Sequence, residues 1–446
     1  MLFCFTLSRV EGLQNRQILL SMERDMEEKF IINGGRPLNG EIEVRGAKNA
    51  AFPILAATLL TKKECLIENM PLIEDVFRML EILKGMGSEI FWVGERAVKI
   101  NNSQINPEHL REDIIKRLRG SVLFQGPLLA RFGKVQFPQP GGCVIGARPI
   151  DAHLDGFNQL GVDIRRYGKN YILENRNGNA GGKAILNEFS VTATENLMIF
   201  AGLNSGKTII KTADQDYQVQ ELSKFLRKMG INIRGTGTHQ LAIEGSKNPK
   251  GARHKLMYDP IEAGTFMLMA AATKGDVLIK NVEIDFLELP LKKLKDFGVP
   301  WKLENKKNIR ILPWKKLAID KVQSLIYPGI PSDLQSAFGV LATRSPGSTL
   351  IHDPLYEGRL KYLEELNKMG AEIYFADPHR AIINGPTQLY GRELESLDLR
   401  GGAALIIAGL IAKGKTVINN IYQIDRGYER IEERLQKIGA DIKRIV

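Results

Sequence analysis

One segment of the chain combines a cysteine with several glycines and an arginine. The segment PQPGGCVIGARPIDAH places Cys143 after Gly141 and Gly142, with Gly146 and then Arg148 further on. Glycines permit unusual backbone angles, so the spacing predicts a mobile loop. A nearby guanidinium group lowers the pKa of a thiol or binds an anion. A buried, inert thiol is the alternative for a lone cysteine, and the polar, glycine-rich surroundings favour the reactive interpretation.

A second segment, VRGAKNAAFPILAA, places a cation at the start of a helix. We expect a strand to end at Gly46 and a helix to begin with Lys48 and Asn49. Backbone N–H groups and the helix dipole attract anions at such a position, and lysine adds a full charge. From the residue alone, a solvated surface lysine is equally compatible with the pattern.

Two further helix starts carry polar side chains. In NEFSVTATEN, Ser190 or Thr192 is suited to cap a helix, with backbone N–H groups nearby for an anion. In YPGIPSDLQSAF, Asp333 follows Pro331 and Ser332, where an aspartate cap is the usual explanation. A carboxylate there is also suited to accept a proton, and the two roles are compatible.

Three arginines lie beside glycine or at strand-to-helix junctions in the second half of the chain. They are Arg359 in YEGRLKYLEEL, Arg400 in LDLRGGAAL and Arg426 in IDRGYERIEERL. Isolated arginines are usually surface residues, but three at equivalent helix starts of different repeats would converge on one anion-binding cleft. The SGKT sequence at 205–208 lacks the upstream glycine spacing of a phosphate-binding loop and is interpreted as a turn.

A repeat of about seventy residues must position these side chains. Six times a leucine-rich helix runs into a glycine and then a β-like segment, and each glycine stands where a left-handed helix C-cap is expected. These glycines are Gly87, Gly161, Gly230, Gly298, Gly370 and Gly439. Most repeats also hold an alanine-rich helix before a β-branched strand, as in AGTFMLMAAATKGDVLIK, and we interpret those helices as core. The matching stretch of the second repeat is more divergent.

Composition limits the class of protein. The 446 residues are 43% hydrophobic and 25% charged, which suits a globular α/β chain of two or three domains. The formal charge of +11 is compatible with anionic substrates, but there is no basic run or arginine–aromatic motif typical of nucleic-acid binding. No apolar stretch of about 18 residues predicts a membrane span. Cys4, Cys65 and Cys143 are too few and too far apart for a disulfide framework or a cysteine zinc site, so a reducing, cytoplasmic location is expected.

Residues 1–26 make a poor signal peptide, because the apolar start lacks a basic region and is interrupted by Arg9 and Glu11. We expect them to be a flexible extension or to result from a misassigned start.

The GAKNAA block, the Cys143 segment and the six repeats together resemble the enolpyruvyl transferases, from about residue 28 to the end. The resemblance implies a two-lobed inside-out α/β barrel with six βαβαββ repeats, three per lobe. One lobe is expected at 48–257, and the other at 27–47 with 258–446. Within this family the cysteine loop resembles that of the UDP-N-acetylglucosamine transferases, since the enolpyruvylshikimate phosphate synthases lack it.

The resemblance assigns a role to each candidate residue. Lys48 and Asn49 would contact phosphoenolpyruvate and the sugar nucleotide, and Cys143 would be a general acid and the target of fosfomycin. Arg359 and Arg400 would bind the phosphoenolpyruvate carboxylate, and Arg426, Lys48 and Arg148 its phosphate. UDP-N-acetylglucosamine would contact Arg119, Arg148, Pro149, Ile150, Asp151, Ala152, Ser190, Val191, Thr192, Asp333 and Leu355, with His153 next to them.

The mechanism implied is addition followed by elimination. Cys143 protonates the methylene of phosphoenolpyruvate, the 3′-hydroxyl of the acceptor attacks, and Asp333 receives the hydroxyl proton. Loss of a methyl proton and of phosphate then restores the double bond, while Lys48 and the arginines stabilise charge. No metal, organic cofactor or obligate protein partner is expected.

The chain departs from the family pattern at a few positions. Gln215, Asp216, Tyr217 and Gln218 stand where an Arg-Glu-Pro-Glu run is common, Pro260 replaces a basic residue, and Tyr356 and Gly358 replace Phe and Asn. One alternative is a transferase with another acceptor, and Cys143 argues against a shikimate-like one. The other alternative is a catalytically inactive homologue.

Overall fold

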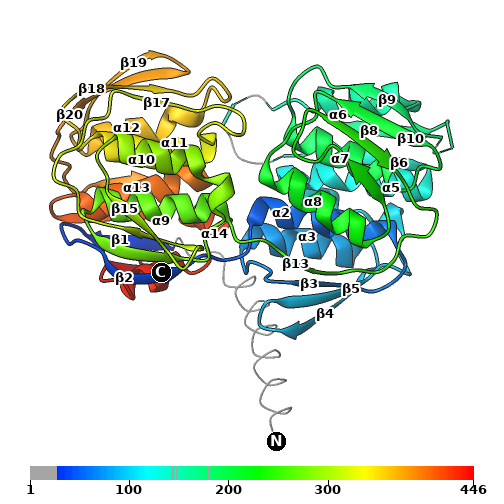
Figure 1. The fold of residues 1–446 in the computed structure, drawn as a ribbon, viewed down its shortest axis with the longest axis horizontal. Coiled ribbons are helices and arrows are strands. Elements are labelled where there is room, and N and C mark those ends of the chain that lie inside the picture. The colour runs from blue at the N-terminus through cyan, green and yellow to red at the C-terminus, as the bar shows by residue number, and fades with distance from the viewer. Residues whose placement is uncertain (1–27, 142–144, 147, 179) are drawn as a thin grey trace, which may run out of the picture. The chain divides into compact units, whose positions relative to one another are not determined.

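The computed structural model describes residues 28–141, 145–146, 148–178 and 180–446, and these form two compact units (Figure 1). Among the described residues, unit 1 holds 28–45, then Ile145 and Gly146, and then Tyr258–Val446. Unit 2 holds 46–141 and Arg148–Met257. The chain therefore passes between the units beside Arg45 and beside Met257, and Ile145 and Gly146 group with unit 1.

Unit 1 is built from three repeats of the expected βαβαββ type. In each sheet the strands of the repeat lie in the order first, second, fourth, third. The first repeat is β2 (Asn39–Glu43), α9 (Pro260–Ala272), β14 (Asp276–Lys280), α10 (Glu288–Asp296), β15 (Trp301–Glu304) and β16 (Asn308–Ile311). The second is β17 (Lys321–Gln323), α11 (Ser332–Ala342), β18 (Gly347–His352), α12 (Tyr362–Lys368), β19 (Glu372–Asp377) and β20 (Arg380–Gly385).

The third repeat of unit 1 takes its fourth strand from the other end of the chain. It comprises β21 (Glu393–Glu395), α13 (Leu399–Ile411), β22 (Lys415–Asn419), α14 (Tyr422–Asp425), α15 (Ile431–Gln436) and β23 (Asp441–Ile445). The N-terminal strand β1 (Lys29–Asn33) lies between β22 and β23 and is antiparallel to both. The two ends of the chain therefore complete one sheet.

Unit 2 repeats the same plan. Its first repeat is β13 (Arg253–Lys255), α2 (Lys48–Ala57), β3 (Cys65–Glu68), α3 (Glu74–Gly85), β4 (Glu89–Gly94) and β5 (Ala97–Asn101). Its third is β9 (Gly182–Ile185), α7 (Val191–Ala201), β10 (Lys207–Lys211), α8 (Tyr217–Lys228), β11 (Asn232–Arg234) and β12 (Gln240–Glu244). Both form four-stranded sheets in the order first, second, fourth, third.

The second repeat of unit 2, whose sequence is the most divergent, has a three-stranded sheet in the order β6, β8, β7. It comprises α4 (Glu112–Ile115), α5 (Gln125–Phe132), β6 (Lys134–Pro138), α6 (Asp151–Gln159), β7 (Val162–Tyr167) and β8 (Asn170–Asn175). In the described part of the chain, this sheet has no first strand.

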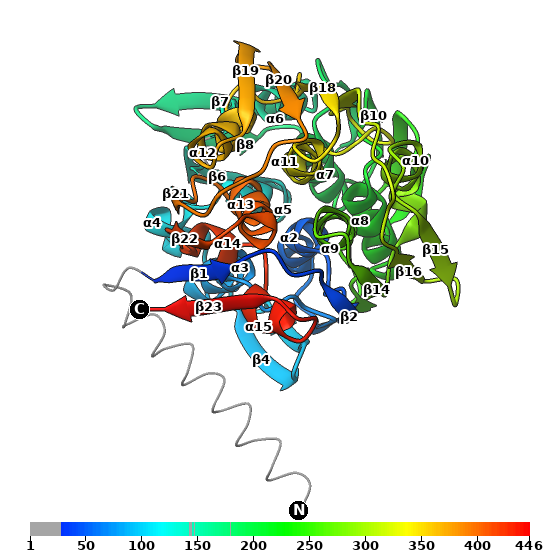
Figure 2. The same cartoon turned by 90° about the vertical axis from the view of Figure 1, so that its left-hand side faces the viewer.

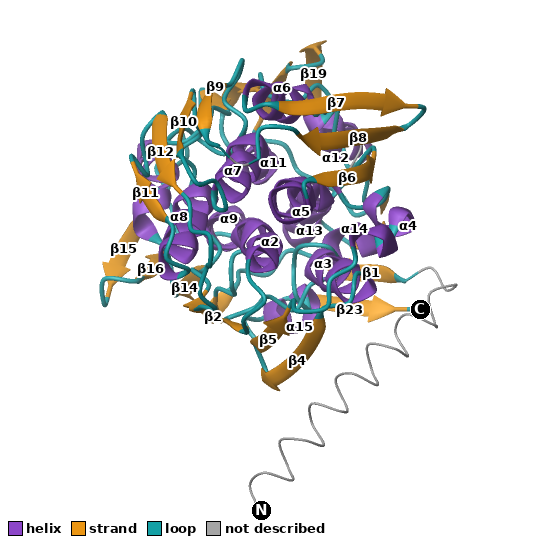
Figure 3. Cartoon of the chain, turned by 90° about the vertical axis from the view of Figure 1, so that its right-hand side faces the viewer, coloured by secondary structure: helices purple, strands orange, loops and turns teal. Residues whose placement is uncertain are grey.

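Alanine-rich helices occupy the middle of each unit and the sheets lie outside them. In unit 1, α11 packs against α9 and α13 (Figure 2), and in unit 2, α7 packs against α2 and α5 (Figure 3). Every residue of α9 is buried, as suits a helix that is apolar on all sides. A Cβ atom at Gly264 would lie 2.6 Å from Leu334, so glycine allows α9 and α11 to approach closely. The prediction that these helices form the core is confirmed.

The six glycines that follow the outer helices all have positive φ, between 87° and 104°. This left-handed conformation is the C-cap predicted from the repeat, and it turns the chain from helix to strand at the same point of each unit. In the SGKT sequence, Ser205 and Gly206 form the predicted turn, and Lys207 and Thr208 already belong to β10.

Candidate active site

In unit 1, two arginines converge on Asp333 in the first turn of α11. Arg359 donates from Nη2 to Asp333 Oδ1 over 2.9 Å, and Arg400 donates from Nε to Oδ2 over 3.0 Å. The Arg400 Nη2 atom also lies 3.0 Å from Oδ2. The side chains of Arg359 and Arg400 are 4% and 3% exposed, and that of Asp333 is 26% exposed. Asp333 is therefore the member of this cluster that solvent reaches most easily.

Further carboxylates fix the guanidinium group of Arg359. Its Nε donates to Ser332 Oγ over 3.0 Å, and that hydroxyl donates to the buried Asp353 over 2.6 Å. Its Nη1 lies 3.7 Å from Asp398 Oδ1. Burial by itself lowers the pKa of Arg359, but the carboxylates of Asp333, Asp398 and Asp353 outweigh burial and raise it. The group is therefore a permanent cation with a fixed orientation.

Arg400 is held by its backbone and by a tyrosine. Its N–H group donates to Asp398, which caps α13, and its Nη1 donates to Tyr428 Oη over 3.1 Å. Tyr428 Oη lies 2.9 Å from Thr265 Oγ1 on α9. Burial lowers the pKa of Arg400, yet Asp333 and Tyr428 raise it well above the usual value. Two cationic forks are thus presented side by side, which suits a carboxylate ligand.

The other two candidates in unit 1 lie at the end of α14 and on the loop after β18. Arg426 directly follows α14, is 7% exposed, and donates from Nη1 to Gln423 over 3.0 Å. It is two residues before Tyr428, the partner of Arg400. Leu355 has a side chain exposed to solvent, and its backbone N–H donates to Asp353. Asp353 thus connects this loop to Ser332 at the start of α11.

Asp333 does not cap α11, contrary to the helix-capping role expected from the sequence. Pro331 occupies the N-cap position and Asp333 is the second residue of the helix. Its carboxylate instead accepts hydrogen bonds from the two arginines, so its position in the first turn holds the arginine cluster together.

In unit 2, Lys48 is the first residue of α2, and its Nζ lies 2.7 Å from Asp75 Oδ2. The two side chains are 9% and 5% exposed. The Phe52 ring lies 5.6 Å from Nζ, and Asn49, the next residue of the helix, is partly exposed. Asp75 was missed from the sequence, because an acid in the first turn of α3 is normally explained by the helix dipole alone.

The segment expected to meet the nucleotide forms the start of α6. Arg119 donates from Nη2 to the Pro149 carbonyl over 2.7 Å, which ties the two predicted regions together. Ile150 is buried and precedes the helix. Of the remaining residues, which are near Ile150 along the chain, Arg148 and Ala152 are partly exposed and Asp151 is exposed.

His153 links this helix to α7. Its Nε2 lies 3.1 Å from Thr192 Oγ1, and its Nδ1 lies 3.0 Å from Asn196 Nδ2. Asn196 Oδ1 accepts the N–H of Gly126, so Nδ2 is the donor to His153. Nδ1 therefore accepts and Nε2 carries the proton that is donated to Thr192. Burial and the charge of Arg119 lower the pKa of His153 to about 3, so the ring is neutral.

Ser190 caps α7, as one of the sequence interpretations has it. Its side chain accepts the N–H of Ala193 over 3.4 Å. Thr192, whose hydroxyl accepts from His153, keeps its own hydroxyl proton for another acceptor. With the N–H groups of Val191 and Thr192 in the same turn, the start of α7 is suited to an anionic oxygen.

Cys143 lies outside the described residues. Ile145, two residues on, accepts the N–H of Gly358 over 3.0 Å, so this part of the segment contacts the loop that carries Arg359. Cys65 is fully buried in β3, and burial raises the pKa of its thiol to about 11. Cys65 is therefore an inert core residue.

The departures from the family pattern fall at helix starts and loops. Asp216 caps α8 by accepting the N–H of Tyr217, and Pro260 is the first residue of α9. The Tyr356 ring lies 5.3 Å from the Arg359 guanidinium. These replacements keep the local structure and leave the charged candidates in place.

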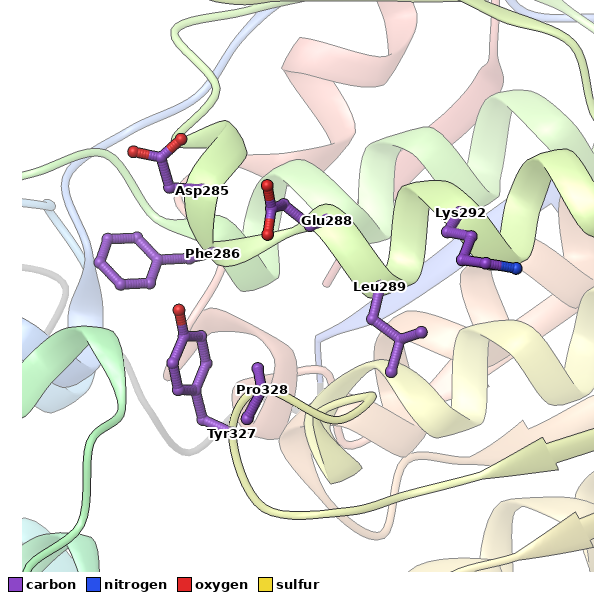
Figure 4. A pocket seen from close by; sticks show the side chains of 7 residues that line it. All are labelled: Asp285, Phe286, Glu288, Leu289, Lys292, Tyr327 and Pro328. Carbon is purple, nitrogen blue, oxygen red and sulfur yellow. The ribbon is translucent and has the colours of Figure 1, made fainter. Parts of the chain in front are cut away.

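A pocket of about 500 Å³ in unit 1 lies elsewhere (Figure 4). The Phe286 and Tyr327 rings, 5.8 Å apart, form part of its wall. Its lining comprises Asp285, Phe286, Glu288, Leu289, Lys292, Tyr327 and Pro328. None of the predicted site residues lines it.

The described residues contain no group of three or more His, Cys, Asp or Glu that could hold a metal ion. Across the same residues, no helix has the length and apolar character needed to cross a membrane.

Comparison with known proteins identifies the class. The family model of EPSP synthase (3-phosphoshikimate 1-carboxyvinyltransferase) matches residues 32–435. The fold resembles the enolpyruvyl transferase NikO from Streptomyces tendae, with a TM-score of 0.84 and 22% identity over 94% of this chain and 99% of that one. EPSP synthase from Acinetobacter baumannii matches with a TM-score of 0.69 over 94% and 100% of the two chains. The chain belongs to this family of enolpyruvyl transferases.

The more similar relatives share one name within that family. UDP-N-acetylglucosamine 1-carboxyvinyltransferase 1 of Caldanaerobacter subterraneus is 41% identical over 94% of this chain and 100% of its own length. The enzyme of that name from Carboxydothermus hydrogenoformans is 42% identical over 94% and 98%. The UDP-N-acetylglucosamine 1-carboxyvinyltransferase of Coxiella burnetii is 40% identical over 94% and 96%.

Proposed function

We propose that this protein transfers the enolpyruvyl group of phosphoenolpyruvate to the 3′-hydroxyl of UDP-N-acetylglucosamine and releases phosphate. The observation that carries the proposal is the identity of 40% to 42% with the UDP-N-acetylglucosamine 1-carboxyvinyltransferases over nearly the whole chain. This reaction is the first committed step of peptidoglycan synthesis, and we place it in the cytoplasm.

The site residues fit the charges of phosphoenolpyruvate. Arg359 and Arg400 present two guanidinium groups on one unit, which suits the substrate carboxylate. Arg426, Lys48 and Arg148 bind the phosphate in this proposal, and Asn49 lies beside Lys48. Because the cations are fixed before substrate binds, they stabilise developing charge without reorganisation.

The nucleotide sugar binds to residues at the starts of α6 and α7. Arg119, Arg148, Pro149, Ile150, Asp151 and Ala152 contact the UDP moiety, and Ser190, Val191 and Thr192 contact its diphosphate. Support comes from the Arg119 bond to Pro149 and from the Thr192 hydroxyl, whose proton is available for an acceptor. Leu355 and Asp333 contact the sugar.

Proton transfers are divided between two residues. Cys143 protonates the methylene carbon, and the acceptor oxygen bonds to the adjacent carbon while Asp333 takes the hydroxyl proton. The tetrahedral intermediate then loses a proton from its methyl group and expels phosphate, which restores the carbon–carbon double bond. The reaction needs no cofactor.

A phosphate-release assay with two acceptors tests the proposal. With phosphoenolpyruvate present, UDP-N-acetylglucosamine should support turnover and shikimate 3-phosphate should not. Mass spectrometry should find the nucleotide sugar carrying a carboxyvinyl group. Turnover with shikimate 3-phosphate alone would assign another acceptor, and release with neither would identify an inactive homologue.

A further inference from the structure

The Asp333 carboxylate occupies the same edges of Arg359 and Arg400 that a substrate carboxylate would need. Arg359 uses Nε for Ser332 and turns Nη1 toward Asp398, and its Nη2 meets Asp333. Arg400 uses Nη1 for Tyr428 and directs both Nε and Nη2 to Asp333. The inward edges of both groups are thus occupied by buried partners, and the remaining edge is covered by Asp333.

Differences in burial show which contact can be exchanged. Asp353 is fully buried and Asp398 is 4% exposed, whereas the Asp333 side chain is 26% exposed. Asp398 also caps α13 through two backbone N–H groups, so its removal would disrupt the helix start. Asp333 does not cap its helix. A carboxylate arriving from solvent meets Asp333 first and can replace it at the least structural cost.

We propose that Asp333 is a built-in substitute for the substrate carboxylate, and that phosphoenolpyruvate binds by displacing Asp333 from Arg359 and Arg400. This inference rests on the proposed function and deepens it. The exchange replaces one carboxylate by another, so the charge next to the two arginines is conserved. No bond is broken other than hydrogen bonds and ion pairs.

The displacement has a chemical consequence for Asp333. A carboxylate paired with two guanidinium groups is a weak base, because the neighbouring positive charges favour its ionised form. Once the substrate carboxylate takes its place, Asp333 no longer meets the two guanidinium groups and becomes a stronger proton acceptor. Asp333 is then an effective proton acceptor only when phosphoenolpyruvate is in position to react.

Binding of two unreactive probes tests the exchange without an acceptor substrate. Phospholactate has the carboxylate and phosphate of phosphoenolpyruvate without its double bond, and inorganic phosphate lacks the carboxylate. Calorimetric titration should show that Asp333→Asn binds phospholactate about tenfold more tightly than the wild type, since a neutral amide competes poorly for guanidinium groups. Affinity for inorganic phosphate should be unchanged. Turnover should fall as the proton acceptor is lost.

Asp276→Asn is the matched control, because Asp276 on β14 also pairs with an arginine of unit 1, Arg310 on β16, in a different sheet from the cluster. It removes the same charge and should leave phospholactate affinity as in the wild type. Asp333→Ala should tighten binding in the same direction, which guards against an effect of the asparagine itself, and thermal melts check folding. Unchanged or weaker phospholactate binding by both Asp333 variants would overturn the displacement. A protein without any acceptor turnover would instead refute only the proposed function, since the probes react with nothing.

Discussion

Lys48 Nζ and Asp75 Oδ2 lie 2.7 Å apart at the start of α2, with both side chains almost wholly buried. A buried cation left without its counter-ion is costly, and removal of one partner of such a pair typically destabilises a protein by about 3 kcal/mol or more. The pair therefore fixes the orientation of Lys48, which binds phosphate in the proposed function, and makes that orientation depend on Asp75.

We expect Asp75→Ala to lower the free energy of unfolding by about 3 kcal/mol and to raise the KM for phosphoenolpyruvate. The double variant Lys48→Met/Asp75→Leu should recover most of the stability, because apolar side chains replace the ion pair, but should remain inactive. Denaturant unfolding and steady-state kinetics separate the two effects. Asp75→Ala with wild-type stability and KM would show that the pair has neither role.

The pH dependence of stability should report on His153. Its pKa is lowered to about 3 in the folded protein, below the ordinary 6.5, so the unfolded chain binds more protons between those values. Stability from this residue is complete above about pH 6.5 and is lost as the pH falls toward 3. In His153→Gln, the slope of unfolding free energy against pH should be smaller by up to about 1.4 kcal/mol per pH unit. Parallel curves for the two proteins between pH 4 and 6 would contradict this.

Among the kinetic constants, we expect Arg400→Lys to change the KM for phosphoenolpyruvate most. Lysine keeps the charge, but a single ammonium cannot meet Tyr428 and a carboxylate in the fork geometry of arginine. Loss of one charge-assisted hydrogen bond corresponds to a KM increase of about tenfold or more. Arg344→Lys is the control, since Arg344 bonds the Ala272 carbonyl and stacks on Trp314. It should change stability and leave the KM for phosphoenolpyruvate as it was; an equal effect of the two variants would remove Arg400 from the site.

Fosfomycin should alkylate Cys143 and leave Cys65 unmodified. Cys65 is fully buried and its pKa is raised to about 11, so little thiolate forms at neutral pH. Cys143→Asp should keep turnover and resist the drug, because a carboxylic acid donates a proton but is a poor nucleophile toward the epoxide. Cys143→Ser should lose most turnover. Peptide mass spectrometry locates the adduct, and an adduct on Cys65 with an active Cys143→Ser enzyme would defeat the assignment.

Repeats and caps were predictable because they depend on local chemistry that recurs. Gly87 and its five equivalents predict the same turn, and the apolar, alanine-rich segments predict the helices of the core. The divergence of the second repeat was visible in the sequence, but the loss of a strand from its sheet, which has the order β6, β8, β7, was not predicted from it. β1 could not be assigned to the last sheet in this way, because its partners β22 and β23 are almost the whole chain away.

The candidate site was predictable by residue type and only partly by contact. Arg359 and Arg400 converge as expected, but their helix starts are not equivalent. Arg359 precedes α12, the second helix of one repeat, and Arg400 lies in the first turn of α13, the first helix of the next. Their attachment to Asp333 was not expected, because the sequence favours a cap for an acid at a helix start. The link of His153 to Asn196 was not predicted either, since the two residues lie on different helices and in motifs that are more than forty residues apart along the chain.

The position of β1 between β22 and β23 constrains how the protein is made. During translation, Lys29–Asn33 is made long before both of its neighbours, which lie at Lys415–Asn419 and Asp441–Ile445. The inner helices α2, α5 and α7 can pack while the nascent chain still lengthens, but the last sheet of unit 1 cannot be completed until Asp441–Ile445 has been synthesised. A ribosome that stops before Asp441 therefore leaves an apolar strand with one edge unpaired, and incomplete chains carry a ready site for aggregation or for quality-control factors.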